Sequence, residues 1–263
     1  MWVYIGTSEL KNAYIGEYTI ITERPDIDTY SLAIQKTGLR GQHAICISSD
    51  GKYLYIFYSW KIYWFYLSDW SLNSYTWTAA STSSTVDSRW MFFKDENTIY
   101  SFSDTGTFQK ISMSNYDLSG GTVTTLSNNL GSGKCWCEFN PDGTQFYCVK
   151  RWNEAYQYGL STSYNPNTTS LNYTLSTSSV VSSNTYCIRV SPTGKKVFIS
   201  NRASGTNNKI YQYDCSTPRD LSTAVYSNKS LTLGYWSSFD VTDSGDIFTI
   251  SFNSSAIYQY SSS

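Results

Sequence analysis

Residues that could carry acid–base or metal chemistry are scarce in this chain of 263 residues. His43 is the single histidine, so a nucleophile–histidine–acid triad would have to use it, and we interpret it as structural. Asp26 and Asp28 lack the further oxygen-rich run that a calcium site needs. Residues 131–134 read Gly-Ser-Gly-Lys, without the earlier glycine and the following Ser or Thr of a phosphate-binding loop. The sequence therefore predicts a non-enzymatic protein with no catalytic site, no metal site and no cofactor.

Three charged residues share one position of a repeated pattern. Glu138, Arg189 and Asp240 each stand five residues before a turn glycine, in acid–base–acid order, and Cys46 and Phe92 hold this position in two earlier repeats. The position alternates with apolar residues, so its side chains lie on the opposite face of the strand. Because buried charges need partners, we predict a structural ion-pair cluster. The functional alternative is a polar site that lines a channel and binds a ligand or an ion.

The turns that set this register recur along the chain. They read Ser49-Asp-Gly51, Pro141-Asp-Gly143, Pro192-Thr-Gly194 and Asp243-Ser-Gly245, with a degenerate copy Lys94-Asp-Glu-Asn97. We expect Asn97 to replace glycine by adopting the left-handed conformation that Asn tolerates. From Gly51 to Gly245 the successive spacings are 46, 46, 51 and 51 residues. A period of this length with four strands per unit is typical of β-propeller blades.

Apolar residues alternate in the strand before each turn and should pack between neighbouring blades. They are Ile45 and Ile47, Met91 and Phe93, Cys137 and Phe139, Ile188 and Val190, and Phe239 and Val241. The sequence thus predicts an all-β fold, with residues 1–263 forming a single β-propeller domain of four-stranded antiparallel blades. Its units span approximately residues 1–43, 44–89, 90–134, 135–184, 185–236 and 237–263.

The first and last units are incomplete in complementary ways. Residues 2–7, 13–20 and 29–34 are expected to form the second, third and fourth strands of a first unit that lacks a first strand. The last unit supplies three strands between Ser237 and Tyr260 and lacks a fourth. Strands from both termini would close the ring and remove free sheet edges. We count six blades; the alternative is a five-blade closure in which residues 2–7 complete the last blade.

Loops between the second and third strands carry the candidate binding residues. We expect them on the face of the connections between blades, and their aromatic and Arg side chains suit recognition. The predicted partner-binding residues are Trp60, Arg151, Trp152 and Arg202. The alternative is that the Trp residues cover blade edges. Trp70, Tyr116 and Tyr164 lie in loops between third and fourth strands and are expected to cap the rim of the other face.

Composition excludes several classes of partner. Lys and Arg number 19 against 20 Asp and Glu, so the net charge is −1 and the basic excess of a nucleic-acid-binding protein is absent. No apolar run is long enough to cross a bilayer, so we expect no membrane insertion. The N-terminus reads as a strand at once, without a basic region or cleavage site, and no signal peptide is expected.

The six cysteines lie mostly within predicted strands, and we interpret them as buried, reduced residues that pack as small hydrophobic groups. One pair is an exception. If residues 142–143 form a two-residue turn, Cys137 lies opposite Cys148, close enough for a cross-strand disulfide. A three-residue bulged turn would shift the register and remove that pairing.

Three phrases in the later units carry a resemblance. They are Phe139-Asn-Pro-Asp-Gly-Thr, Ser191-Pro-Thr-Gly-Lys-Lys-Val-Phe and Ile210-Tyr-Gln-Tyr-Asp-Cys-Ser-Thr-Pro-Arg-Asp-Leu-Ser-Thr-Ala224. They resemble the "SPDGTKmYv…vYQYDLSTPWDLSTA" repeats of β-propellers found in bacteriophage virion and tail-associated proteins. The similarity covers almost the whole chain and is strong in the fourth to sixth units. Cys215 stands where that phrase usually has Leu, and Arg219 where it often has Trp.

The resemblance implies a virion structural or adhesion protein at the surface or tail of a phage-like particle, made in the host cytoplasm. Such a module would bind neighbouring virion proteins, a host-surface receptor or a glycan. An alternative from another class is a glycan-active or lactone-active propeller enzyme, which would need clustered carboxylates or a metal at the channel mouth. A third alternative is a propeller scaffold without a ligand.

Overall fold

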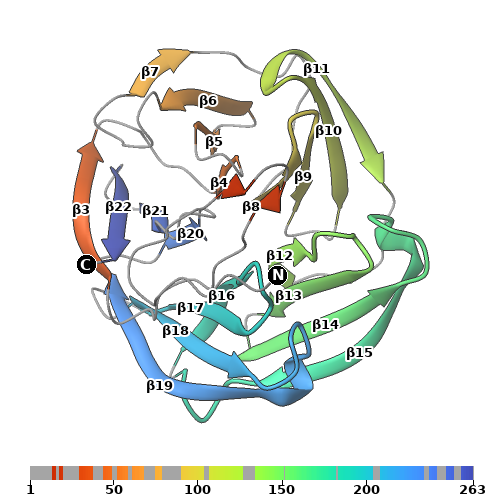
Figure 1. Cartoon of the computed structure of the whole chain (residues 1–263), viewed down its shortest axis with the longest axis vertical. Coiled ribbons are helices and arrows are strands. Elements are labelled where there is room, and N and C mark those ends of the chain that lie inside the picture. Colours follow the sequence, from red (N-terminus) through yellow and green to blue (C-terminus); the bar gives the residue numbers. More distant parts are fainter. Residues whose placement is uncertain are drawn as a thin grey trace.

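The computed structural model describes residues 14–15, 18–19, 30–37, 44–48, 52–58, 61–67, 75–78, 90–103, 107–126, 134–150, 152–181, 183–203, 208–233, 237–241, 247–251 and 256–262. Their strands form five four-stranded antiparallel sheets, arranged as the blades of a β-propeller (Figure 1). The all-β class and the four-stranded blade are therefore as predicted. Within these residues, no helix has the length and apolar character needed to cross a membrane.

Four blades are each built from one continuous stretch of chain, and each is named here after its innermost strand. The β4 blade contains β4 (Ala44–Ile47), β5 (Tyr53–Tyr58), β6 (Lys61–Leu67) and β7 (Tyr75–Thr78). The β8 blade contains β8 (Trp90–Asp95), β9 (Thr98–Phe102), β10 (Phe108–Ser114) and β11 (Asp117–Leu126). The β12 blade contains β12 (Lys134–Phe139), β13 (Gln145–Lys150), β14 (Glu154–Leu160) and β15 (Thr169–Ser176). The β16 blade contains β16 (Asn184–Val190), β17 (Lys196–Arg202), β18 (Asn208–Cys215) and β19 (Ala224–Leu233).

The β20 blade combines the two ends of the chain. It contains β20 (Ser237–Val241), β21 (Ile247–Ser251) and β22 (Ala256–Ser262), and its outermost strand is β3 (Tyr30–Thr37). β3 pairs antiparallel with β22, from Thr37 opposite Ala256 to Tyr30 opposite Ser262. The strand that the sequence assigned to the first unit, residues 29–34, therefore completes the last blade.

The other N-terminal strands also differ from those predicted for the first unit. The single strand predicted over residues 13–20 is instead a short antiparallel pair, β1 (Tyr14–Ile15) with β2 (Tyr18–Thr19). Residues 2–7, which the five-blade alternative used to complete the last blade, lie outside the described residues. The described part of the chain contains five four-stranded blades, so the count of six is not confirmed.

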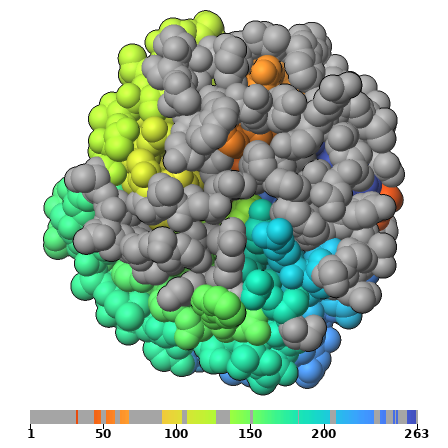
Figure 2. Space-filling view, turned by 180° about the vertical axis from the view of Figure 1, so that it is seen from behind, coloured from red at the N-terminus to blue at the C-terminus, as the bar shows by residue number. Residues whose placement is uncertain are grey.

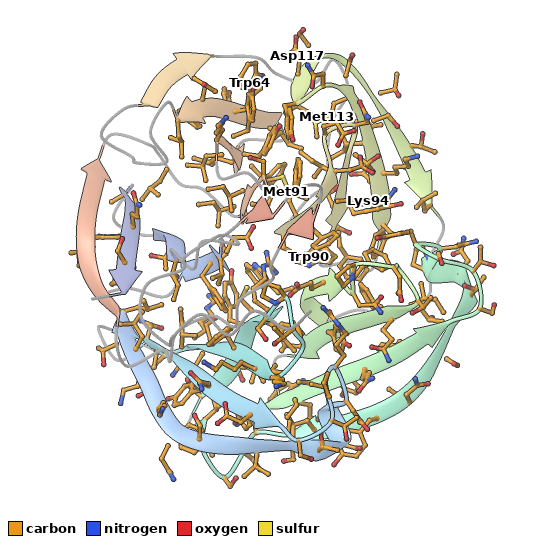
Figure 3. The ribbon with its side chains drawn as sticks, viewed as in Figure 1. Trp64, Trp90, Met91, Lys94, Met113 and Asp117 are labelled. Atoms are coloured by element: carbon orange, nitrogen blue, oxygen red, sulfur yellow. The ribbon has the colours of Figure 1, made fainter. Side chains whose placement is uncertain are left out.

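The apolar inner strands surround the centre of the molecule. β4, β8, β12 and β16 contact one another in chain order, β16 contacts β20, and β20 contacts β4. The alternating apolar residues predicted for these strands, from Ile45 to Val241, are all buried. Figure 3 shows Trp90 and Met91 on β8 near the centre and Asp117 at the outer edge of the same blade.

Two of the predicted glycine turns have the same backbone geometry. In the β12 blade the N–H of Asn140 donates to the carbonyl of Gln145 (3.0 Å), and Gly143 closes the turn with φ of 71°. In the β16 blade Gly194 has φ of 78°. Asn97 of the β8 blade differs from the prediction, because it is not among the residues with positive φ. Its side-chain oxygen instead accepts a hydrogen bond from the N–H of Asn115 (3.2 Å).

Each of three loops between third and fourth strands docks on the turn of its own blade through one left-handed residue. Tyr116, Tyr164 and Arg219 have φ of 69°, 57° and 64°. Their N–H groups donate to turn carbonyls: Tyr116 to Glu96 (2.7 Å), Tyr164 to Gly143 (2.9 Å) and Arg219 to Gly194 (2.8 Å). Tyr116 and Tyr164 therefore cover the turns on this face, while Trp70 lies outside the described residues.

The repeated Ser-Thr-rich phrase builds a capped single turn of 3₁₀-helix after each docking residue of the last two continuous blades. In η4 (Leu221–Thr223) the side chain of Asp220 accepts a hydrogen bond from the N–H of Ser222 (2.9 Å). Asn165 caps η3 (Pro166–Thr168) in the same way, through the N–H of Asn167 (3.1 Å). Asx caps of this kind satisfy backbone donors that a short helix leaves unpaired. They fix the loops that present Tyr164 and Arg219.

The turn glycines give a stability prediction. A Cβ atom on Gly194 would lie 2.3 Å from Cγ of Arg219 and 2.8 Å from its backbone N, whereas a Cβ on Gly120, at φ of 80°, meets nothing within 4 Å. Gly120→Ala should lower the free energy of unfolding by about 1–2 kcal/mol, the cost of the left-handed conformation alone. Gly194→Ala should cost a further ~1 kcal/mol or more, because the loop must move. Urea denaturation of both variants checks this, and equal losses would contradict it.

Candidate functional site

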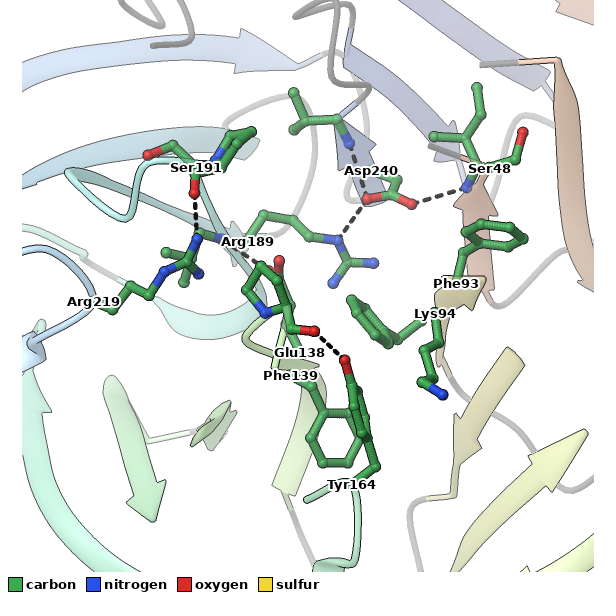
Figure 4. Close-up of a pocket in the computed structure, with 16 residues that line it drawn as sticks. Ser48, Phe93, Lys94, Glu138, Phe139, Tyr164, Arg189, Ser191, Arg219 and Asp240 are labelled. Carbon is green, nitrogen blue, oxygen red and sulfur yellow. Dashed lines mark hydrogen bonds and ion pairs between the residues drawn. The ribbon is translucent and has the colours of Figure 1, made fainter. Parts of the chain in front are cut away.

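A cavity of about 260 Å³ lies at the centre, on the face that carries the turns between first and second strands (Figure 4). All five blades contribute to its wall. The lining residues are Ile47, Ser48, Phe92, Phe93, Lys94, Glu138, Phe139, Pro141, Tyr164, Arg189, Val190, Ser191, Pro192, Arg219, Asp240 and Val241. The three charged residues that the sequence placed at one repeat position are thus brought into one cavity.

The buried Arg189 forms an ion pair with the partly buried Asp240 of another blade. Nε of Arg189 on β16 lies 2.7 Å from Oδ1 of Asp240 on β20, and only 2% of Arg189 is exposed. Burial on its own lowers the pKa of the Arg189 guanidinium, but the charges of Asp240 and Glu138 raise it by more, so its pKa lies above the ordinary value. The guanidinium therefore stays charged in the interior.

The same guanidinium reaches a third blade. Nη1 of Arg189 donates to the carbonyl of Ile188 (2.9 Å), and Nη2 donates to the carbonyl of Met91 on β8 (3.3 Å). Arg189 thereby links the β16, β20 and β8 blades. Burying a guanidinium group costs free energy unless its N–H donors have acceptors. These contacts supply such acceptors, which is consistent with a structural role for Arg189.

The two carboxylates make one repeated interaction. Oε2 of Glu138 on β12 accepts a hydrogen bond from the backbone N–H of Val190 on β16 (2.8 Å). Oδ2 of Asp240 on β20 accepts one from the backbone N–H of Ile47 on β4 (2.9 Å), and its Oδ1 also accepts from the N–H of Val241 (2.9 Å). In both cases a carboxylate on one inner strand binds the equivalent N–H of the following blade. The cluster therefore connects neighbouring inner strands.

Lys94 and Arg219 are cavity residues that the sequence reasoning missed. Nζ of Lys94 lies 3.0 Å from Oδ2 of Asp95 and 4.7 Å from the ring centroid of Tyr164. Nη2 of Arg219 donates to the carbonyl of Pro192. Arg219 could have been singled out, because it stands where the resembling repeats often have Trp. The sequence does not predict the loop conformation that brings Arg219 to the centre.

The predicted partner-binding loops lie at the opposite end of the strands. β13 starts beside the turn at the cavity and ends beside Trp152, whose side chain is 74% exposed. Arg202 is exposed at the end of β17, with its Cζ 5.8 Å from the ring centroid of Tyr186. Trp60 and Arg151 lie outside the described residues. The structure therefore does not bring Trp152 and Arg202 to the cavity, and their partner-binding role stays a prediction. Figure 2 shows the molecule from behind Figure 1, with the β12 and β16 blades, green to blue, across its lower half.

The cysteines near the centre are thiols. Cys137 and Cys148 are register partners, as the turn predicted, and both are free. Burial raises the pKa of the Cys187 thiol to about 12, and burial also raises the pKa of the Cys46 thiol well above its ordinary value. Thiols held protonated in this way are poor nucleophiles. Among the described residues, which do not include His43, no three His, Cys, Asp or Glu side chains are grouped closely enough to hold a metal ion.

No protein-family model matches the chain, and no curated protein matches it in sequence. Similar solved structures include a functionally unknown protein of Desulfotomaculum acetoxidans (12% identity, TM-score 0.45, covering 79% of this chain and 64% of that one). Two others, assigned provisionally as 6-phosphogluconolactonases, come from Bacteroides uniformis (14%, 0.44, 81% and 64%) and Bacteroides fragilis (13%, 0.49, 80% and 76%). The chain spans just under two thirds of the first two. Likeness at this level carries no argument about activity.

The ion pair gives the second prediction. Arg189→Met keeps much of the side-chain volume but leaves the Asp240 carboxylate and the Met91 carbonyl without their partner. We expect the free energy of unfolding to fall by about 3–5 kcal/mol. Lys195→Met, an exposed control, should change it by no more than about 0.5 kcal/mol. Denaturation followed by tryptophan fluorescence measures both, and an Arg189→Met protein as stable as the parent would refute the structural role.

Proposed function

We propose that the chain is a non-enzymatic recognition propeller of five blades, closed into a ring by β3. The observation that carries this proposal is the use of the central charged groups. Glu138 and Asp240 accept backbone hydrogen bonds from the following blade, and Arg189 links three blades. A general acid or base needs a group that can exchange a proton with a substrate, whereas these groups are engaged in holding the fold.

We place partner binding on the face of the loops between second and third strands. Trp152 supports this proposal, because it is the most exposed of the large hydrophobic side chains among the described residues, at 74%. Exposed Trp and Arg side chains on loops are the residue types that dominate binding energy when a partner covers them. Arg202 on a neighbouring blade supplies a second such group on the same face.

The resemblance of the repeats supports a place for this module in a phage-like particle. The phrases that carry the resemblance build the turn at Gly194 and the capped loop from Asp214 to Thr223. On this proposal the partners are neighbouring virion proteins or a host-surface receptor or glycan. The opposing hypothesis to test is the lactone-active enzyme that the sequence left as an alternative.

The third prediction tests partner binding on a glycan array with the fluorescently labelled protein. We expect bound glycans whose signal falls roughly tenfold or more in Trp152→Ala, since removal of a central aromatic anchor commonly costs 2 kcal/mol or more. Tyr173→Ala removes a partly exposed aromatic residue from the outer strand β15 and should leave the signal unchanged. A signal that survives Trp152→Ala would move the binding surface elsewhere.

The same preparations are tested with 6-phosphogluconolactone. No hydrolysis above the uncatalysed rate is expected for the parent protein. Hydrolysis that disappears in Glu138→Gln would replace the present proposal with the enzyme hypothesis. Absence of both hydrolysis and array binding would favour a scaffold whose only contacts are within its own assembly.

A further inference from the structure

The polar groups that line the central cavity differ in how many hydrogen bonds they already make within the protein. Its acceptors already have donors: Asp240 accepts from Arg189, Ile47 and Val241, and Glu138 accepts from Val190. The carbonyls of Pro141 and Pro192 accept from the Tyr164 hydroxyl and from Arg219. A ligand in the cavity therefore finds few acceptors left for its own donors.

The cations at the rim keep spare donors. Lys94 carries three N–H donors and Arg219 five. Within the described part of the chain, Lys94 pairs with Asp95, and one guanidinium nitrogen of Arg219 donates to Pro192. Among the lining side chains, Lys94, Arg189 and Arg219 face the carboxylates of Glu138 and Asp240, and Asp95, outside the lining, offsets the charge of Lys94. The unfilled hydrogen-bonding capacity of Lys94 and Arg219 favours a ligand rich in acceptors.

The remaining wall is aromatic. Ring centroids of Phe92 and Phe139 lie 6.0 Å apart, and those of Phe139 and Tyr164 lie 5.3 Å apart. These rings come from the β8 and β12 blades, next to Lys94 (Figure 4). An aromatic wall beside a cation suits a ligand with a flat or apolar body and one charged group.

The size of the cavity limits the ligand. A volume of about 260 Å³ corresponds to roughly nine water molecules at about 30 Å³ each. This is enough for one ring with its substituents and too little for an oligomer to enter fully.

We propose that this cavity binds a small organic acid: one carboxylate or phosphate group on a body the size of a single sugar ring. Lys94 and Arg219 lie on opposite sides of the cavity (Figure 4), so one supplies a charge-assisted hydrogen bond to the acid group and the other to an oxygen of the ring, while Phe139 and Tyr164 pack against the ring. Arg189 keeps its structural role at the base of the cavity. This site lies on the face opposite Trp152 and does not depend on the proposed recognition function.

The test is isothermal titration calorimetry with D-glucuronate, D-glucose 6-phosphate and D-glucose. We expect one or both acids to bind at least tenfold more tightly than glucose, and the acid that binds identifies a carboxylate or a phosphate as the preferred group. Lys94→Gln and Arg219→Gln should each weaken binding of that acid about tenfold, the loss expected for one charge-assisted hydrogen bond. Lys110→Gln, on β10 outside the cavity, removes the same charge and should leave the affinity unchanged.

Two outcomes would overturn the proposal. One is that neither acid binds more tightly than glucose. The other is that Lys110→Gln weakens binding as much as Lys94→Gln, which would make the effect one of net charge. Thermal unfolding of each variant is measured in parallel, and Lys94→Gln, at a partly exposed side chain, keeps the test decisive if Arg219→Gln disturbs its loop.

Discussion

The inner edge of each blade has backbone groups without a neighbouring strand, and these groups lie at the crowded centre of the molecule. A buried N–H without an acceptor costs about as much as a lost hydrogen bond, so the centre must supply acceptors. Glu138 and Asp240 do so for Val190 and Ile47. Two partly buried carboxylates then need a positive charge, and Arg189 provides it. The charged residues at the centre are therefore explained by the need to satisfy the unpaired backbone groups of the inner strands.

This solution also shapes the cavity above it. Because the acceptors at the centre are engaged with backbone N–H groups and with Arg189, the unfilled hydrogen-bonding capacity belongs to the cations at the rim. Lys94 comes from the end of β8 in one blade, and Arg219 from a loop docked on the turn of another. The chemical preference of the cavity is thus set by charged groups at its base that keep few spare acceptors, and by cations at its rim that keep spare donors.

The blade pattern was predictable because it is local. Turn glycines such as Gly143 and Gly194, and the alternation of residues before them, set the register that brings Glu138, Arg189 and Asp240 to one level. The partner of β3 was not predictable, since its alternation indicates a strand without naming a neighbour more than 200 residues away. Arg219 was missed because left-handed conformations of Tyr164 and Arg219 bring loops to the centre, and Tyr and Arg do not signal such conformations. Lys94 was assigned to the degenerate turn, whereas it lies on β8. Asn97 showed that a Gly-to-Asn replacement need not preserve φ.

Tyr30 pairs with Ser262, 232 residues later in the chain, and this separation affects the order in which the sheets can form. During synthesis β3 emerges first and must wait unpaired until β22, more than 200 residues later in the chain, has been made. The four continuous blades carry no such delay, because their contacts are local. The last sheet to mature should therefore limit the folding rate, since long-range pairing carries the largest loop-closure entropy.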